Sequence, residues 1–256
     1  MSSSIGRRLG ANSNGAAPYV TVHKSGSLAR LTLNSVDNAN SISPGFAAAL
    51  MAAVTEIADD ACISVLVVDH SGPYFCTGAS ADFLDAPQPA DVEPILRSLA
   101  HIPVPVIAKL KGHAIGGGLV LGLYADLPVL CSSSYYSANF VALGLAPSYG
   151  ATWILANRFG PGVASELLYT GRRVRGSEFA ERGVAVPVLE PGSLDGYVED
   201  LAMQLSQHRP PLMRLLKRQL QTQLLEASDQ AMRHEIGPHL TSWLSGRDGT
   251  VASGAS

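Results

Sequence analysis

The chain has 256 residues, of which 46% are hydrophobic, and this length is enough to bury a sizeable core. Its formal net charge of −3 argues against a nucleic-acid-binding surface. No apolar run approaches membrane-spanning length, so we expect no association with a membrane. The cysteines, 3 in all, are few and odd in number, which is typical of a reducing compartment rather than a disulfide framework and predicts a cytoplasmic location.

The first part of the sequence predicts a tail, a hairpin and a helix. Residues 1–17 are rich in Ser, Gly and Asn, which predicts a flexible N-terminal tail. Two short apolar segments, 19–23 and 29–33, predict the paired strands of a hairpin. Apolar residues at helical spacing predict a helix at 46–57, and Pro44 suits its first turn.

Two glycine-containing turns each follow an apolar segment that predicts a buried strand. The strand at 63–69 precedes residues 75–79, whose sequence is Phe-Cys-Thr-Gly-Ala. The strand at 104–108 precedes residues 112–118, whose sequence is Gly-His-Ala-Ile-Gly-Gly-Gly. The apolar segment 119–123 then predicts a buried helix that starts directly after the second turn.

Such a pair of turns can hold one oxygen atom between two backbone N–H groups. The start of a helix has free N–H groups and the positive end of the helix dipole, and glycine lets a ligand approach the backbone closely. Two donors that face one oxygen form an oxyanion hole. A pure packing role is the alternative for a glycine triplet. The second turn is not a phosphate-binding loop, because Gly118 is not followed by Lys and Ser or Thr.

The rest of the chain predicts a core of alternating strands and helices, followed by a helical region. Residues 83–92 mix Asp, Pro and Ala and predict a loop that covers a site. Alternation up to about residue 189 predicts an α/β core of parallel strands joined by helical crossovers. Three helices are then predicted at 197–207, 211–225 and 226–244. We accordingly divide the chain into a tail (1–17), a core (18–192), a helical region (193–244) and a second flexible tail (245–256).

The segment 102–147 resembles the crotonase (enoyl-CoA hydratase/isomerase) superfamily. The similarity lies in the Gly-x-x-x-Gly-Gly-Gly turn, the following Ala125-Asp126, and Gly144-x-x-Pro147, and it extends from about residue 20 to 244. This resemblance implies a stacked ββα spiral core, a helical C-terminal region and a homotrimer, either alone or as one half of a hexamer. It also implies no resident cofactor, because the acyl thioester substrate itself brings coenzyme A or phosphopantetheine.

The resemblance also implies where the reaction takes place. It assigns the two oxyanion-hole donors to the N–H groups of Ala79 and Gly117, next to Gly78 and Gly116 in the substrate-binding turns. The two glutamates of the family's hydratases fall on Val120 and Phe140, and neither side chain can transfer a proton. An apolar pair suits decarboxylation instead, because CO₂ leaves from the substrate and no general base is needed.

Further similarity points to one subgroup, the decarboxylases of polyketide β-branching (HMG-synthase) cassettes. It rests on segments 112–118, 136–140 and 144–152, the last of which includes Tyr149 as a candidate substrate contact. The subgroup converts a 3-methylglutaconyl group on an acyl carrier protein to a 3-methylcrotonyl group. Some members have a lysine that acts on the substrate carboxylate, but residues 80–100 of this chain contain no Lys, which leaves Ser80, Tyr149 or an unplaced residue for that contact.

The resemblance implies a catalytic histidine on a late helix, and Met232-Arg233-His234-Glu235 matches its context. A histidine titrates near neutrality and can protonate the dienolate after CO₂ leaves. An exposed helix histidine is the alternative for His234, and His239 is the second candidate for the proton donor. Two other functions stay open: an enoyl-CoA isomerase or hydratase with an unrecognised acid, and a catalytically silent assembly partner.

Overall fold

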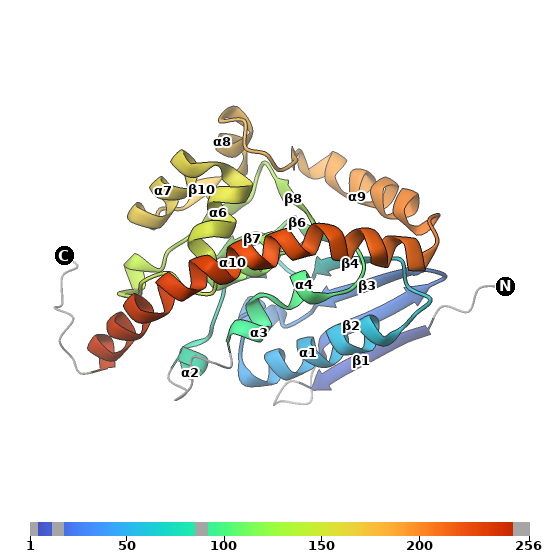
Figure 1. Ribbon diagram of the computed structural model, residues 1–256, viewed down its shortest axis with the longest axis horizontal. Coiled ribbons are helices and arrows are strands. Elements are labelled where there is room, and N and C mark those ends of the chain that lie inside the picture. The colour runs from blue at the N-terminus through green and yellow to red at the C-terminus, as the bar shows by residue number, and fades with distance from the viewer. Residues whose placement is uncertain (1–4, 12–17, 85–91, 248–256) are drawn as a thin grey trace.

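The computed structural model describes residues 5–11, 18–84 and 92–247. A seven-stranded sheet and a four-stranded sheet form the centre of the described fold, and helices cover them (Figure 1). The larger sheet contains, in spatial order, β1 (Ile5–Ala11), β2 (Pro18–Ser25), β3 (Leu28–Leu33), β4 (Val65–His70), β6 (Val106–Leu110), β8 (Leu127–Cys131) and β11 (Val188–Leu189). The smaller sheet contains β10 (Val174–Arg175), β9 (Tyr135–Ser137), β7 (His113–Ile115) and β5 (Tyr74–Cys76).

The helices come mostly between strands in the first part of the chain and consecutively at its end. They are α1 (Pro44–Asp59), α2 (Ala81–Leu84), α3 (Glu93–Leu96), α4 (Ser98–His101), α5 (Gly117–Leu123), α6 (Ala151–Phe159), α7 (Pro161–Thr170), α8 (Gly176–Glu181), α9 (Pro191–Ser206) and α10 (Pro210–Arg247). Short 3-10 turns lie at Val36–Asn38 and Val141–Leu143. None of the described helices has both the length and the apolar character needed to cross a bilayer.

The predicted α/β architecture is confirmed. Strands β2 and β3 form the expected antiparallel hairpin, and β3, β4, β6, β8 and β11 run parallel to one another. Strand β4 is buried on both faces, as expected for a parallel strand between two helical layers. Its Leu66 and Val68 belong to the main core, whereas Val65 and Val67 pack in a second cluster with Leu194 of α9.

The expected N-terminal tail at 1–17 contains a strand. Strand β1 pairs antiparallel with β2 from Ile5 opposite Lys24 to Ala11 opposite Pro18. Its sequence carries two arginines and two glycines and lacks the apolar alternation of a half-buried strand. Pairing with the backbone of an otherwise open edge strand explains its conformation, because edge pairing needs no particular side chains.

The helical region consists of two helices where three were expected. Helix α9 begins at Pro191, so the expected boundary between residues 192 and 193 falls inside its first turn. Helix α10 continues from Pro210 through the junction expected at 225/226, because no residue there interrupts it, and it includes residues 245–247 of the expected second tail. It runs across almost the whole molecule in Figure 1. The remainder of that tail, 248–256, lies outside the described residues, as does most of the loop expected at 83–92.

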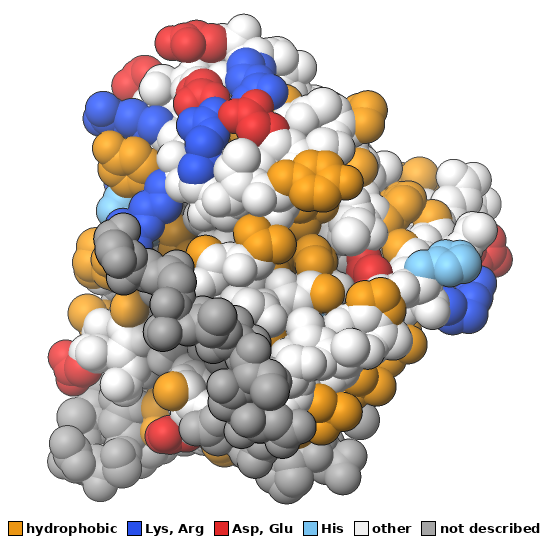
Figure 2. Space-filling model, turned by 90° about the vertical axis from the view of Figure 1, so that its left-hand side faces the viewer, with side chains coloured by type: hydrophobic (Ala, Val, Ile, Leu, Met, Phe, Trp, Pro, Cys, Tyr) orange, Lys and Arg blue, Asp and Glu red, His pale blue; other side chains and the backbone are white. Residues whose placement is uncertain are grey.

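One face of the molecule carries charged side chains of both signs close together. In Figure 2, Lys and Arg side chains lie beside Asp and Glu side chains in the upper part of the face, with hydrophobic side chains across its middle. Four residues of α7, α8 and their ends form such an ion-pair cluster: Glu166, Arg172, Glu178 and Arg182.

Candidate active site

A pocket of about 80 Å³ lies beyond the carboxyl ends of β5 and β7, where the two glycine turns meet. Its lining consists of Ile42, Thr77, Gly78, Ala79, Val92, Leu96, Gly116, Gly117, Asn139, Phe140, Leu143, Leu145, Ser148, Tyr149 and His239. None of these lining residues is an Asp, Glu, Lys or Arg. Within the described part of the chain, the pocket is therefore apolar apart from backbone groups, one amide, three hydroxyls and one imidazole.

The backbone N–H groups of Ala79 and Gly117, at this pocket, have no acceptor in the described part of the chain. Ile42 donates its N–H to the Gly78 carbonyl at 2.8 Å and accepts the Ser80 N–H at 3.0 Å, so this parallel bridge directs the N–H of Ala79 away from Ile42. Gly117 is the first residue of α5, where an N–H has no intrahelical partner.

Gly78 keeps these two donors open. Its φ of +81° is in the region that favours glycine, and a Cβ at this position would lie 3.0 Å from the N atom of Gly117. Any side chain at position 78 would therefore crowd the second donor. The two turns are thus in direct contact.

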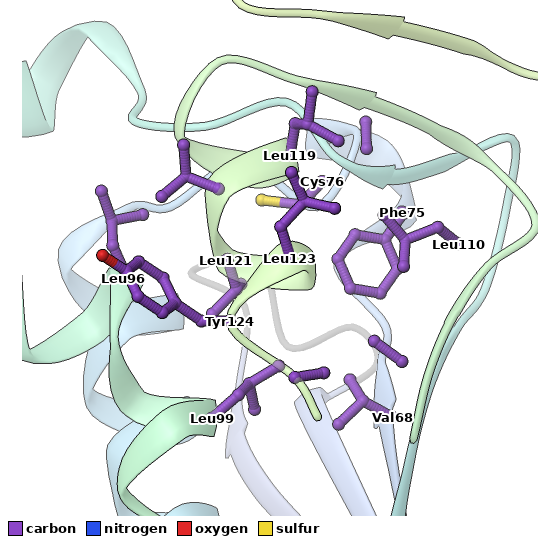
Figure 3. Close-up of a cluster of buried hydrophobic side chains, with 14 of the residues drawn as sticks. Val68, Phe75, Cys76, Leu96, Leu99, Leu110, Leu119, Leu121, Leu123 and Tyr124 are labelled. Carbon is purple, nitrogen blue, oxygen red and sulfur yellow. The ribbon is translucent and has the colours of Figure 1, made fainter. Parts of the chain in front are cut away.

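Helix α5 holds Gly117 in place because the helix is buried among apolar side chains. Leu119, Leu121 and Leu123 project from α5 into a cluster that includes Phe75 and Leu110 (Figure 3). The helix also lies directly against β5. A Cβ on Gly118 would come within 2.2 Å of the Cys76 carbonyl oxygen, so only glycine allows this approach. Burial raises the pKa of the Cys76 thiol to about 12, which fits the packing role of this residue.

The candidate substrate-binding positions separate into pocket residues and one core residue. Gly116, Phe140 and Tyr149 line the pocket, as does Gly78. Val120 does not line it. The expectation for Val120 is wrong because this side chain is 1% exposed and belongs to the main core cluster.

His239, and not His234, lies at the pocket. His239 lines it, its Nδ1 lies 2.7 Å from the Ala146 carbonyl oxygen, and its ring makes an edge contact with the Tyr149 ring at 5.5 Å between centroids. His234 is exposed on α10 and is absent from the lining. The placement of His234 as the proton donor is therefore corrected, because a separation of five residues turns the two side chains to different sides of a helix.

Helix α10 is fixed to the segment 146–152 by three polar residues on one helical face. Ser242 accepts the N–H of Ala146 at 2.9 Å, while His239 contacts the carbonyl of the same residue. The buried carboxylate of Glu235 accepts the N–H groups of Gly150 at 2.7 Å and Thr152 at 2.9 Å. Glu235 thereby caps the N-terminus of α6, and the pocket wall formed by this segment depends on α10.

Ser148 is a pocket residue that the sequence analysis did not single out. The residue is 2% exposed, and its Oγ has no hydrogen-bond partner within the described chain. Its neighbour Tyr149 has a φ of 63°, and burial raises the pKa of the Tyr149 phenol to about 12, so the phenol is neutral at pH 7. No motif in the sequence indicates that the side chain of Ser148 would lack a partner.

Two sets of described ion pairs outside the pocket lining have structural roles. Asp126 accepts hydrogen bonds from the Val106 N–H and from the buried ammonium of Lys217, outside the pocket lining. Arg97, also buried, pairs with Glu93 at 2.9 Å and with Asp229. In the described residues, no group of three His, Cys, Asp or Glu side chains is placed to hold a metal ion.

Comparison with known proteins agrees with this fold and pocket. The enoyl-CoA hydratase/isomerase family model matches residues 23–242. The chain is 35% identical to the bacillaene synthase decarboxylase PksI of Bacillus subtilis over 136 residues, which are 53% of this chain and 55% of that protein. It is 32% identical to the probable enoyl-CoA hydratase EchA14 of Mycobacterium tuberculosis over 170 residues, which are 64% of this chain and 66% of that one. These curated relatives are thus matched over only about half to two thirds of their length.

A solved structure extends the similarity to nearly the whole chain. The ECH2 decarboxylase domain of CurF from Lyngbya majuscula superimposes with a TM-score of 0.79 and 27% identity, covering 88% of this chain and 94% of that domain. The chain belongs to the enoyl-CoA hydratase/isomerase family, and its fold is the crotonase fold with a C-terminal helical region. Its relatives include both decarboxylases and hydratases.

Proposed function

We propose that this protein decarboxylates a carboxylated enoyl thioester, of the 3-methylglutaconyl type, carried on an acyl carrier protein, and forms the 3-methylcrotonyl thioester during polyketide β-branching. One observation carries the proposal. In the part of the chain that the structure describes, the pocket combines two unbonded backbone N–H groups with a lining that contains no carboxylate. Similarity to decarboxylases from bacillaene synthase and CurF supports the same reaction class.

The reaction needs little more than the groups that line the pocket. The bond between the γ-carbon and the carboxylate breaks, CO₂ leaves, and the electron pair moves through the double bond onto the thioester oxygen. The N–H groups of Ala79 and Gly117 stabilise the resulting dienolate, and such a donor contributes roughly 3–4 kcal/mol. The apolar lining favours this step, because charge on the carboxylate disperses as CO₂ departs.

His239 is the proton donor in this proposal. Because a carbonyl only accepts hydrogen bonds, the Nδ1 that contacts the Ala146 carbonyl carries a proton. In the imidazolium form Nε2 carries a second proton, which can pass to a carbon of the dienolate and restore a neutral thioester. The acyl carrier protein as partner and the homotrimer belong to the same proposal and rest on the family resemblance.

Hydration or isomerisation of an enoyl-CoA is the second candidate, supported by the identity to EchA14. Water addition requires a group that positions water and a group that protonates carbon. Positions 120 and 140 are Val and Phe, so a hydratase reaction would need an acid outside the expected positions. A catalytically silent assembly partner would differ from both candidates by turning over neither substrate.

Incubation of the full chain with 3-methylglutaconyl carrier protein, followed by mass spectrometry of the acyl group, tests the proposal. Loss of CO₂ is the expected result. Parallel incubation with crotonyl-CoA measures hydration. Hydration without decarboxylation would support the second candidate, and no turnover of either thioester would support the silent partner.

A further inference from the structure

The hydroxyl of Ser148 is a buried polar group without a partner at the wall of the pocket. Ser148 is 2% exposed, lines the pocket, and its Oγ finds no acceptor or donor within the described chain. Buried hydroxyls in folded proteins almost always have a partner, and leaving one unbonded destabilises the fold. An unsatisfied hydroxyl at a pocket wall therefore indicates a group that arrives with the ligand.

The side chain of Ser148 makes no hydrogen bond that supports the local structure. A serine just before a helix often caps it, but Glu235 already accepts the N–H groups of Gly150 and Thr152 at the start of α6. The Ser148 carbonyl, in turn, accepts the N–H of Ala151 at 3.2 Å. The backbone of Ser148 thus supports the turn, while its side chain contributes no bond to it.

Two other polar side chains of the lining, those of Thr77 and His239, already have partners within the protein. The Thr77 hydroxyl donates to the Ala39 carbonyl at 3.3 Å, and His239 contacts the Ala146 carbonyl through Nδ1. The buried cation Arg97, which follows the lining residue Leu96 in the chain, is held by Glu93 and Asp229 and does not line the pocket. A substrate anion in this pocket therefore meets hydroxyls, backbone N–H groups and the His239 imidazole rather than a Lys or Arg of the described chain.

We propose that the Ser148 hydroxyl donates a hydrogen bond to the terminal carboxylate of the acyl chain and so selects carboxylated thioesters over plain enoyl thioesters. The inference rests on the proposed function, because it assigns the carboxylate of that substrate. A plain hydrocarbon chain would leave the hydroxyl desolvated and unbonded, whereas a carboxylate satisfies it.

A single neutral donor also suits the reaction. A strong ion pair would stabilise the bound carboxylate and would be lost as its charge disperses into CO₂, which would raise the barrier. A hydrogen bond from Ser148 orients the carboxylate at a smaller cost in the transition state. Ser148 thereby acts on recognition, while the N–H groups of Ala79 and Gly117 act on the developing oxyanion.

The test compares two unreactive probes, glutaryl-pantetheine and butyryl-pantetheine, which differ only in the terminal carboxylate. We expect Ser148→Ala to weaken binding of glutaryl-pantetheine by roughly 10- to 100-fold, as for a hydrogen bond to a charged group, and to leave butyryl-pantetheine unchanged. Ser98→Ala is the matched control. Ser98 is 1% exposed and its Oγ also has no partner within the described chain, but it does not line the pocket.

The outcomes separate this inference from the proposed function. The role of Ser148 would be overturned, even in an active decarboxylase, if wild type and Ser148→Ala bound glutaryl-pantetheine with equal affinity. It would also be overturned if the substitution weakened the binding of both probes equally. A selective loss in a protein that fails to decarboxylate would support carboxylate recognition and overturn the proposed reaction. Circular dichroism and a thermal melt verify that each variant is folded.

Discussion

The imidazole of His239 and the carbonyl of Ala146 face each other, with 2.7 Å between Nδ1 and the oxygen. This contact fixes which ring nitrogen carries a proton in the neutral form and leaves Nε2 as the nitrogen free to exchange one with a ligand. It also joins α10 to the segment that leads into α6. The position of the candidate acid is therefore set by a backbone atom rather than by another titrating side chain.

His239→Ala is expected to reduce decarboxylation by roughly 10²–10⁴-fold, because the dienolate would lose its proton donor. His234→Ala serves as the matched control and should retain the parental rate, since His234 is exposed away from the lining. Single-turnover rates and the position of the product double bond are the measurements. A larger loss in His234→Ala than in His239→Ala would reverse the assignment.

Gly117→Pro is expected to lower turnover by roughly 10²–10³-fold, because proline lacks the N–H that one oxyanion donor requires. Position 117 is the first residue of α5, where proline is tolerated in a helix. Gly117→Ala keeps the N–H and is the control; its Cβ would lie 3.2 Å from a methyl group of Leu96, a side chain able to move. A folded proline variant with the parental rate would exclude this donor.

Phe140→Glu is expected to cause a large loss of decarboxylation, because a carboxylate at the pocket wall would repel the carboxylate of the substrate. Phe140→Gln is the control, because glutamine has nearly the same size as glutamate but no charge. It separates the effect of charge repulsion from the effect of losing the phenyl ring. Steady-state kinetics with the carrier-bound thioester compare the two. If both variants are equally impaired, the apolar ring rather than the charge matters at this position.

Glu235→Ala is expected to lower the free energy of unfolding by about 1–3 kcal/mol, because one buried and one partly buried N–H group at the α6 N-terminus would lose their acceptor. Urea denaturation measures the difference. Glu226→Ala is the control, because Glu226 is exposed on the same helix and its loss should change stability by less than about 0.5 kcal/mol. Similar effects of the two variants would contradict the capping role.

Asp195→Asn is expected to destabilise the protein at neutral pH and to lose this effect in acid. The hydrogen bond from Lys111 is the main reason why the pKa of Asp195 lies below its ordinary value of 3.8. A carboxyl with a lowered pKa in the folded state stabilises the protein above the unfolded value and loses that contribution as the pH falls through the folded value. Urea titrations measure the free energy of unfolding of both proteins at neutral pH and below pH 3.8. The two values should differ at neutral pH and converge in acid. A pH-independent difference would mean that the ion pair is not its source.

The turns that hold Ala79 and Gly117 could be predicted from the sequence because glycine has a local cause there. A positive φ at Gly78 and the close approach of Gly118 to Cys76 admit no other residue. Apolar segments likewise predicted the parallel strands, since strands buried on both faces have a nearly continuous apolar sequence.

The choice between His234 and His239 could not be made from the sequence, because it depends on how α10 is rotated. That rotation is set by Glu235, His239 and Ser242, which contact a segment nearly a hundred residues earlier in the chain. The role of Ser148 could not be predicted from the sequence for a related reason. Its significance lies in a missing partner, and only the three-dimensional arrangement reveals that.

The two kinds of chemical group at this pocket come from segments that lie far apart in the sequence. The N–H donor of Ala79 lies in the turn between β5 and α2 and that of Gly117 at the first residue of α5, whereas His239 lies on the long helix α10 near the end of the chain. In the proposed reaction, substitutions on α10 would therefore change the delivery of the proton while the two N–H donors for the thioester oxygen stay in place. Such a division lets evolution replace the acid of an enzyme without rebuilding the site that forms the enolate.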